Sequence, residues 1–207
     1  MPLTPMRALL DRLSVSPVRL RALLTSLSES ALRTAPPAGG FAPIEDAWHL
    51  RDIEVEGHFP RIRRILAEES PVLASIDGDR LALERQYRQR ELGAALDEFA
   101  QYREASLGLL GALAEEAWSR RAIFQDRSVS LRELVVAMAE HDESHLNALA
   151  AESDESTMRE DSFATAPASP GRRPRASPFL RRLASSIRVA SARALLPRWE
   201  DRTRMRS

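Results

Sequence analysis

The sequence predicts an all-α protein whose body is a four-helix bundle. Four stretches of about 20 residues or more carry apolar side chains at helical spacing, and segments rich in turn formers connect them. None of these stretches shows the strict alternation of apolar and polar residues that is typical of a strand. Long amphipathic helices joined by modest loops bury their apolar faces against one another, so a bundle is expected.

The first helix is expected over about residues 4–33. Its apolar positions in the second half are Leu20, Leu23, Leu24 and Leu27. Pro17 should split this helix or begin its main part, because proline lacks the backbone N–H and favours the first turn. A loop rich in Pro and Gly follows at residues 35–43, and Pro43 is well placed as the first residue of the second helix.

The other three helices follow in order, each with its own apolar face. The second ends before Ser70-Pro71 and presents Ile44, Trp48, Ile53, Ile62, Ile65 and Leu66.

A connector containing Ile76-Asp-Gly-Asp79, with a short helix to about Tyr87, leads to the third at about residues 91–118. The third presents Leu92, Leu96, Phe99, Leu110 and Leu113. Ser128 or Ser130 should cap the fourth, where Ser130-Leu-Arg-Glu133 has the capping-box spacing. The fourth continues to about Ala151 and presents Leu131, Leu134, Val135, Met138, Leu146 and Leu149.

The character of the chain changes after the bundle, which is expected to occupy residues 1–152. Residues 153–178 are rich in Ser, Pro, Ala and charge and are predicted to be a disordered linker. Residues 179–207 form an Arg-rich tail in which Phe179, Leu183 and Ile187 predict a short basic amphipathic helix. The formal charge of the whole chain is zero, but residues 171–207 carry +9 and the remainder −9. An acidic body therefore carries a basic tail.

Composition excludes several classes of protein. The chain has 207 residues and no cysteine, which excludes disulfides, thiolate metal ligands and a cysteine nucleophile. No run approaches the roughly 18 uncharged apolar residues of a membrane-spanning helix. A secretory signal needs an unbroken apolar segment, whereas the first 13 residues contain Arg7, Asp11 and Arg12. A cytoplasmic protein is therefore expected. All basic residues are arginine, which we attribute to coding bias, and no nucleic-acid partner is expected.

Three of the four histidines form a candidate metal site. His141 and His145 are four residues apart, so their imidazoles leave the same helix face, and such a pair can bind a divalent ion. On its own this pair is equally compatible with a solvated helix face. His49 lies among residues expected to face the interior, and three convergent imidazoles would leave an open coordination position. His58 is nine residues from His49, half a turn out of phase, and is expected to point away from this site as a surface or packing residue.

Acidic residues near the histidines are candidates for supporting roles. Asp52 and Glu56 recur on the helix face of His49 and could orient an imidazole or accept a proton, although both could also be solvated. Asp142 is a further candidate of this kind. It stands where the HExxH zinc proteases have glutamate, which argues against protease chemistry. Arg103 could bind a substrate carboxylate, but a pairing on the helix surface is the better expectation.

Residues 14–151 resemble the DinB-like (YfiT-like) metal-binding superfamily. The resemblance rests on residues 41–54 (FAPIEDAWHLRDIE), residues 61–66 (RIRRIL) and residues 129–146 (VSLRELVVAMAEHDESHL). It implies a four-helix bundle that binds Zn, Ni or Fe through His49, His141 and His145, and a homodimer. Members with known activity include thiol-dependent transferases and isomerases, and some hydrolases. Phe124-Gln-Asp-Arg-Ser128 departs from the family, because many relatives have a histidine and a glycine there.

The functional expectation is a metal-dependent thiol (S-)transferase that acts on a small-molecule substrate. An ion with an open position lowers the pKa of bound water or ionises a bound thiol, so either hydroxide or a low-molecular-weight thiol cosubstrate could be the nucleophile. The alternatives are a metal-dependent hydrolase and a non-catalytic metal-binding or stress-related bundle. A further alternative makes the basic tail the functional part, through weak contact with a membrane surface or a protein.

Overall fold

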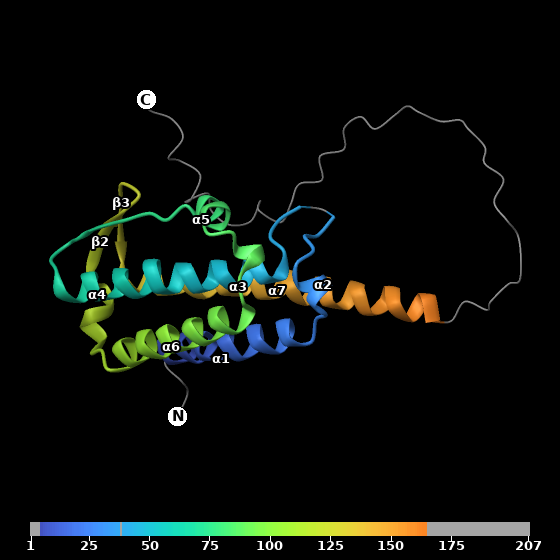
Figure 1. Cartoon of the computed structure of the whole chain (residues 1–207). Coiled ribbons are helices and arrows are strands. Elements are labelled where there is room, and N and C mark those ends of the chain that lie inside the picture. Colours follow the sequence, from blue (N-terminus) through green and yellow to red (C-terminus); the bar gives the residue numbers. More distant parts are fainter. Residues whose placement is uncertain (1–4, 38, 165–207) are drawn as a thin grey trace, which may run out of the picture.

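The computed structural model describes residues 5–37 and 39–164, and its long helices form the predicted four-helix bundle (Figure 1). These helices are α1 (Pro5–Thr25), α6 (Leu92–Gly111), α7 (Leu131–Ala164) and a continuous run made of α3 (Pro43–Asp52), η1 (Ile53–His58) and α4 (Phe59–Ala67). α1 packs chiefly against α6 and α7, whereas α3 packs chiefly against α6 and makes few contacts with α1 and α7.

Short helices occupy the connections. They are α2 (Glu29–Leu32), α5 (Gly78–Glu84) and the two 3-10 helices η2 (Tyr87–Gln89) and η3 (Glu115–Ser119). α5 and η2 confirm the short helical segment predicted up to Tyr87. The α5 helix begins after Asp77, whose carboxylate caps it by accepting a hydrogen bond of 3.0 Å from the backbone N–H of Arg80.

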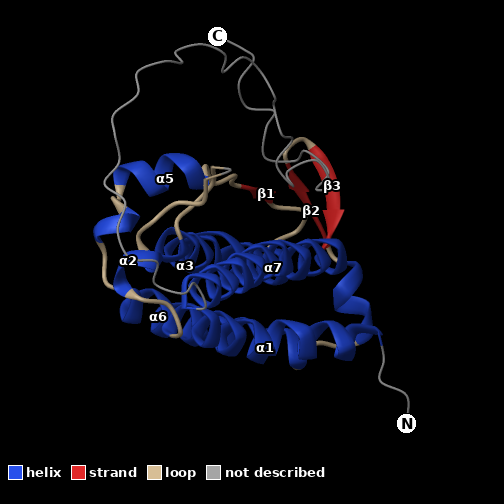
Figure 2. Ribbon diagram, turned by 90° about the vertical axis from the view of Figure 1, so that its right-hand side faces the viewer, coloured by secondary structure: helices blue, strands red, loops and turns tan. Residues whose placement is uncertain are grey.

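A small sheet beside the start of α7 was not predicted (Figure 2). It consists of β1 (Val72–Leu73), β2 (Arg121–Phe124) and β3 (Arg127–Ser130), with β1 parallel and β3 antiparallel to β2. Gln125 and Asp126 form the tight turn of the hairpin, and both have positive φ, as a two-residue turn of this kind requires. Strands of two to four residues are too short to show an alternating pattern in the sequence.

Helix α1 runs through Pro17 without a break, so the prediction of a break there is wrong. Proline cannot donate to the carbonyl four residues earlier, which belongs to Leu13. That carbonyl instead accepts a hydrogen bond of 3.2 Å from Nη1 of Arg103 on α6. A side chain from another helix thus satisfies the group that the proline leaves without a partner.

The ends of the last two long helices also differ from the prediction. α6 ends at Gly111, and the 3-10 helix η3 covers most of the stretch expected to continue it. α7 begins with the predicted capping box, in which Glu133 accepts from the backbone N–H of Ser130. It continues to Ala164, so residues 153–164 of the predicted linker are helical. The rest of that linker and the Arg-rich tail lie outside the described residues. In the described part, no helix combines the length and apolar character needed to cross a membrane.

The buried apolar residues form two separate clusters, one toward each end of the bundle. The first contains Leu13 of α1, Ile62 of α4, Leu110 of α6 and Ala139 of α7. The second contains Leu20, Leu50, Phe99 and Leu146 of the same helical runs. Between the clusters, each run buries polar side chains, namely Ser16, Asp52, Glu54, His58, Arg103, Ser106, His141 and Asp142. We call the buried polar residues of this middle section the polar layer.

Candidate metal centre

Three imidazoles converge where α3 meets α7. His49 comes from α3, and His141 and His145 lie on successive turns of α7. One possible ligand atom from each of the three lies within 4.8 Å of the other two. The Nε2 atoms of His49 and His141 are 3.1 Å apart, and the three ring centroids are 4.7–5.2 Å from one another. The structure thus brings together the three histidines that the sequence singled out.

This geometry matches what a divalent ion requires. Two nitrogens that each lie about 2.0–2.1 Å from one ion are about 3.0–3.4 Å apart at ordinary coordination angles. The separation of 3.1 Å between Nε2 of His49 and Nε2 of His141 falls in that range. Imidazole donors suit Zn, Ni and Fe, whereas Mg and Ca prefer oxygen. The residues present therefore fit an ion of the first group.

Burial keeps two of the rings in the form that can bind a metal. His49 is 5% and His141 7% exposed, and burial lowers the pKa of both well below 6.5, with a smaller contribution from neighbouring imidazoles. Both rings are consequently neutral at pH 7, as a metal ligand must be. The side chain of His145 is 22% exposed, so the site approaches solvent on the side of this residue.

Asp46 holds His145, a role that the sequence analysis missed. With its proton on Nδ1, His145 donates to Oδ1 of Asp46 over 2.6 Å, which leaves Nε2 for an ion. A carboxylate that orients a ligating histidine in this way is a common feature of metal sites. Asp46 is three residues before His49 on α3, so helical spacing could have identified it as a neighbour of the site. Burial raises the pKa of Asp46, and its hydrogen bond to His145 opposes that rise.

Asp52, the other expected supporting residue, is turned toward a different group of side chains. It is fully buried and accepts from Nη1 of Arg51 at 2.5 Å, from Nη1 of Arg85 at 2.6 Å and from the hydroxyl of Tyr87. Glu56 is bound by Arg85 in the same cluster. Both Asp52 oxygens are thus occupied by guanidinium and phenol groups, and Asp46 takes the position beside the imidazoles that we had expected for Asp52.

His58 corrects a second expectation, because it lies close to the site. It is 2% exposed, and its ring centroid is 6.0 Å from that of His141. The reason is that residues 53–58 form a π-helical turn, in which hydrogen bonds run from i to i+5. Each residue in this turn advances the helix by less than the 100° of an α-helix, so the half-turn offset calculated for a regular helix does not apply.

Arg103 forms the centre of a buried ion network next to the histidines, and not the surface pairing expected from the sequence. Its Nη2 donates to Oε2 of Glu54 at 2.9 Å and its Nη1 to Oδ2 of Asp142 at 2.5 Å. Asp142 is therefore paired with Arg103 and is not solvated. The network joins η1, α6 and α7, and its contact with Leu13 adds α1.

Several buried nitrogens of the polar layer, and one of His49 beside it, have no hydrogen-bond partner. They are Nδ1 of His49, Nδ1 of His141, both ring nitrogens of His58 and Nε of Arg103. Buried polar atoms are normally paired, so a concentration of unpaired ones marks a functional site more often than an ordinary core.

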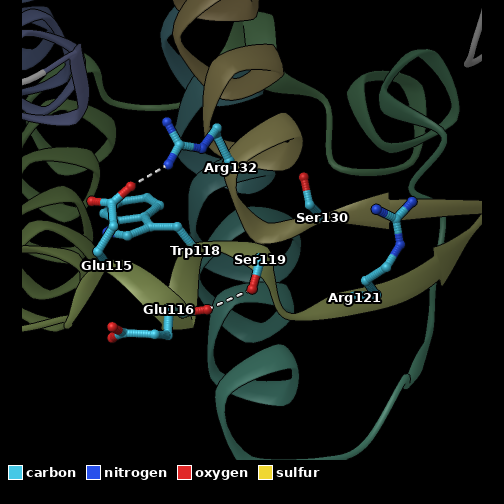
Figure 3. Close-up of a pocket in the computed structure, with 7 residues that line it drawn as sticks. All are labelled: Glu115, Glu116, Trp118, Ser119, Arg121, Ser130 and Arg132. Atoms are coloured by element: carbon cyan, nitrogen blue, oxygen red, sulfur yellow. Dashed lines mark hydrogen bonds and ion pairs between the residues drawn. The ribbon is translucent and has the colours of Figure 1, made fainter.

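A pocket near the start of α7 contains none of the histidines. Figure 3 shows this cavity of about 400 Å³, whose lining residues are Glu115, Glu116, Trp118, Ser119, Arg121, Ser130 and Arg132. Its two arginines and Glu115 pair with protein partners: Arg132 binds Glu115 at 2.6 Å, and Arg121 donates to Ser128 at 2.7 Å. We assign it no chemistry.

Comparisons with known proteins identify the family and agree with the fold. A family model described as the DinB superfamily matches residues 12–149. A solved structure of YfiT from Bacillus subtilis superposes with a TM-score of 0.70 at 16% sequence identity, covering 75% of this chain and 91% of that one. That protein is described as "a probable metal-dependent hydrolase with an unusual four-helix bundle topology". No curated protein matches the chain.

Proposed function

This chain belongs to the DinB superfamily, and from that premise we propose that it is a metal-dependent enzyme whose divalent ion binds His49, His141 and His145. The observation that carries the proposal is the 3.1 Å separation of two buried Nε2 atoms, with the third imidazole beside them. Hydrolysis is the reaction that we favour, and the description of YfiT as a probable metal-dependent hydrolase supports this choice.

Each residue of the site would contribute in a specific way. A divalent ion with an open coordination position lowers the pKa of water or a thiol bound to it, which supplies a nucleophile near neutral pH. Burial keeps His49 and His141 neutral, and Asp46 fixes the ring of His145 with Nε2 toward the other two histidines. Three protein donors leave at least one position for water or substrate, on the more exposed side at His145.

Thiol transfer is the second candidate reaction, and the absence of cysteine favours it. Because the whole chain contains no thiol, a sulfur nucleophile would have to arrive as a low-molecular-weight cosubstrate. An open ion could bind such a thiol as its thiolate. A third candidate is a non-catalytic bundle in which the ion serves only to hold α3 and α7 together.

Metal binding is tested first, with metal-free protein titrated separately with Zn²⁺, Ni²⁺ and Fe²⁺. We expect one ion per chain in the wild type and in Glu140→Ala, a matched control because Glu140 is exposed and directly precedes His141. His141→Ala should lose stoichiometric binding. A His141→Ala variant that still binds one ion as tightly as the wild type would overturn the assignment.

The reaction is tested on the metal-loaded protein. Turnover of esters or amides without added thiol supports hydrolysis, whereas turnover of an electrophile that depends strictly on an added thiol supports transfer. A tightly bound ion that exchanges no ligand, with no turnover in either assay, would favour the non-catalytic bundle.

Oligomeric state and the role of the tail remain proposals from the sequence. We propose a homodimer, which light scattering after size-exclusion chromatography measures directly. The 11 arginines in residues 171–207 favour weak contact with an anionic surface. Flotation with anionic vesicles should therefore recover more of the full chain than of a variant with these arginines replaced by glutamine; equal recovery would contradict the contact.

A further inference from the structure

The connector that leads into α5 lies directly against His49. A Cβ atom placed on Gly78, the first residue of α5, would be 2.5 Å from Cε1 and 2.6 Å from Nδ1 of His49. Distances below 3.0 Å essentially never occur for a real Cβ atom. Gly78 does not have the positive φ that requires glycine elsewhere, at Gly39 and Gly40. Space, and not backbone conformation, therefore excludes a side chain at residue 78.

The connector packs against the helical run at a second point as well. Two residues before Gly78, Cδ1 of Ile76 would lie 3.1 Å from a Cβ atom on Gly57 in the π-helical turn. The connector thus meets the helical run at two points, and at each of them a glycine allows the close approach. The ring of Phe41 is also near His49, with its centroid 5.2 Å from that of the imidazole. His49 is consequently confined by Phe41 and Gly78.

We infer that Gly78 is a positioning residue of the metal centre, because the missing side chain lets His49 keep Nε2 at His141. This inference rests on the proposed function. An alanine at residue 78 must displace the imidazole, which is the mobile end of its side chain. The metal-free fold does not require one exact position of the ring, whereas a ligand must stay within about 0.5 Å of its productive position. The substitution should therefore weaken metal binding more than it weakens the fold.

Titration of metal-free protein with Co²⁺, followed by its visible absorption, tests this inference. Gly78→Ala should bind Co²⁺ about 10–100-fold more weakly than the wild type, the range typical of changes to residues that orient ligands. Gly108→Ala is the matched control, because Gly108 is an exposed residue of α6 with nothing within 4 Å of its Cβ position; its affinity should be unchanged. Wild-type affinity in Gly78→Ala would overturn the inference.

The same titration of His141→Ala separates the inference from the proposed function. If His141→Ala binds Co²⁺ like the wild type, the three-histidine site itself is wrong. If His141→Ala loses binding and Gly78→Ala does not, the site stands and only the role of Gly78 is wrong.

A double-mutant cycle covers the case in which Gly78→Ala folds poorly. The thermal midpoints of wild type, Gly78→Ala, His49→Ala and the double variant are compared without metal. Because His49→Ala removes the ring that a Cβ would meet, any cost of Gly78→Ala should disappear in the double variant. An equal loss of thermal midpoint in both backgrounds would assign Gly78 to the fold and overturn its role toward His49.

Discussion

At the scale of single residues, the contact between Asp46 and His145 distinguishes a built site from a chance meeting of imidazoles. A charged acceptor at 2.6 Å from Nδ1 fixes both the tautomer and the ring plane of His145. The sequence suggested Asp52 for such a role, and only the arrangement of arginine and tyrosine side chains around Asp52 shows that its oxygens are taken.

We predict that Asp46→Asn weakens divalent-metal binding about tenfold, and that Asp46→Ala weakens it up to about a hundredfold. The asparagine keeps an acceptor near Nδ1 but loses the negative charge, whereas the alanine removes both. Isothermal titration with Zn²⁺ measures the two affinities. Asp97→Asn is a control, because Asp97 is exposed and pairs with Arg21 on the surface, away from the histidines. Equal affinities for all variants would contradict the role of Asp46.

The burial of His58 has a cost in the metal-free fold. Both of its ring nitrogens are buried without a hydrogen-bond partner, which destabilises a folded protein by about 1–3 kcal/mol. We predict that His58→Leu raises the free energy of unfolding of the metal-free protein by about 1 kcal/mol, measured by urea denaturation. Tyr87→Phe should have the opposite effect, since the Tyr87 hydroxyl is bonded to Asp52. A clear loss of stability in His58→Leu would show that the ring has a stabilising partner.

At the scale of elements, the π-helical turn decides which side chains enter the polar layer. It directs Glu54 and His58 inward from one short segment, so that Glu54 can bind Arg103 and Ser106 while His58 approaches His141. An isolated π turn inside a helix is frequently associated with a functional site. In this protein the π-helical turn places the buried polar side chains of Glu54 and His58 near the proposed metal-binding histidines.

The Arg103 network gives a second prediction at this scale. Arg103→Met should lower the free energy of unfolding by about 3–5 kcal/mol, because it leaves two buried carboxylates without their cation. It also removes the donor to the Leu13 carbonyl that Pro17 cannot serve. Arg132→Met, which breaks an exposed pair with Glu115, should cost less than about 1 kcal/mol. Chemical denaturation measures both variants, and comparable losses would contradict a special role for the network.

At the scale of the whole molecule, the polar layer divides the core into two apolar clusters, and beside this layer His49, His141 and His145 bring α3 and α7 together. Each cluster forms the apolar core of one end of the bundle. The titratable side chains between the two clusters make the free energy of unfolding depend on pH.

We predict that the metal-free protein loses stability as the pH falls below about 6.5. Burial lowers the pKa of His49, His58 and His141 in the folded state, so the unfolded chain binds more protons in this range and unfolding is favoured. Each histidine contributes up to about 1.4 kcal/mol per pH unit below its unfolded pKa. Urea denaturation at pH 7.5, 6.5 and 5.5 measures the slope, which should be smaller in His58→Leu. A free energy of unfolding that stays constant over this range would contradict neutral burial of these rings.

The bundle and the pairing of His141 with His145 followed from the sequence because both depend on regular spacing along a helix, whereas His49 was added from its expected interior position and from the resemblance to the family. Apolar residues at helical intervals fixed the inner faces, and most predicted apolar positions are buried. The spacing of His141 and His145 placed both imidazoles on one face before any neighbour was known. Helix faces and the spacing of two histidines on one helix depend only on residues near one another in the chain, so a single sequence is enough to predict them.

The remaining features depended on contacts between segments distant in the chain. The carbonyl of Leu13 finds Arg103 across the bundle, Asp46 finds His145 on another helix, and Gly78 meets His49 only after the connector has folded back. The π turn then changes the helical phase of His58, which no regular period predicts. Such contacts depend on how whole helices and loops pack against one another. Only the tertiary structure decides this packing, because many arrangements satisfy the local preferences of each helix, and the free energy of burying apolar surface selects one of them.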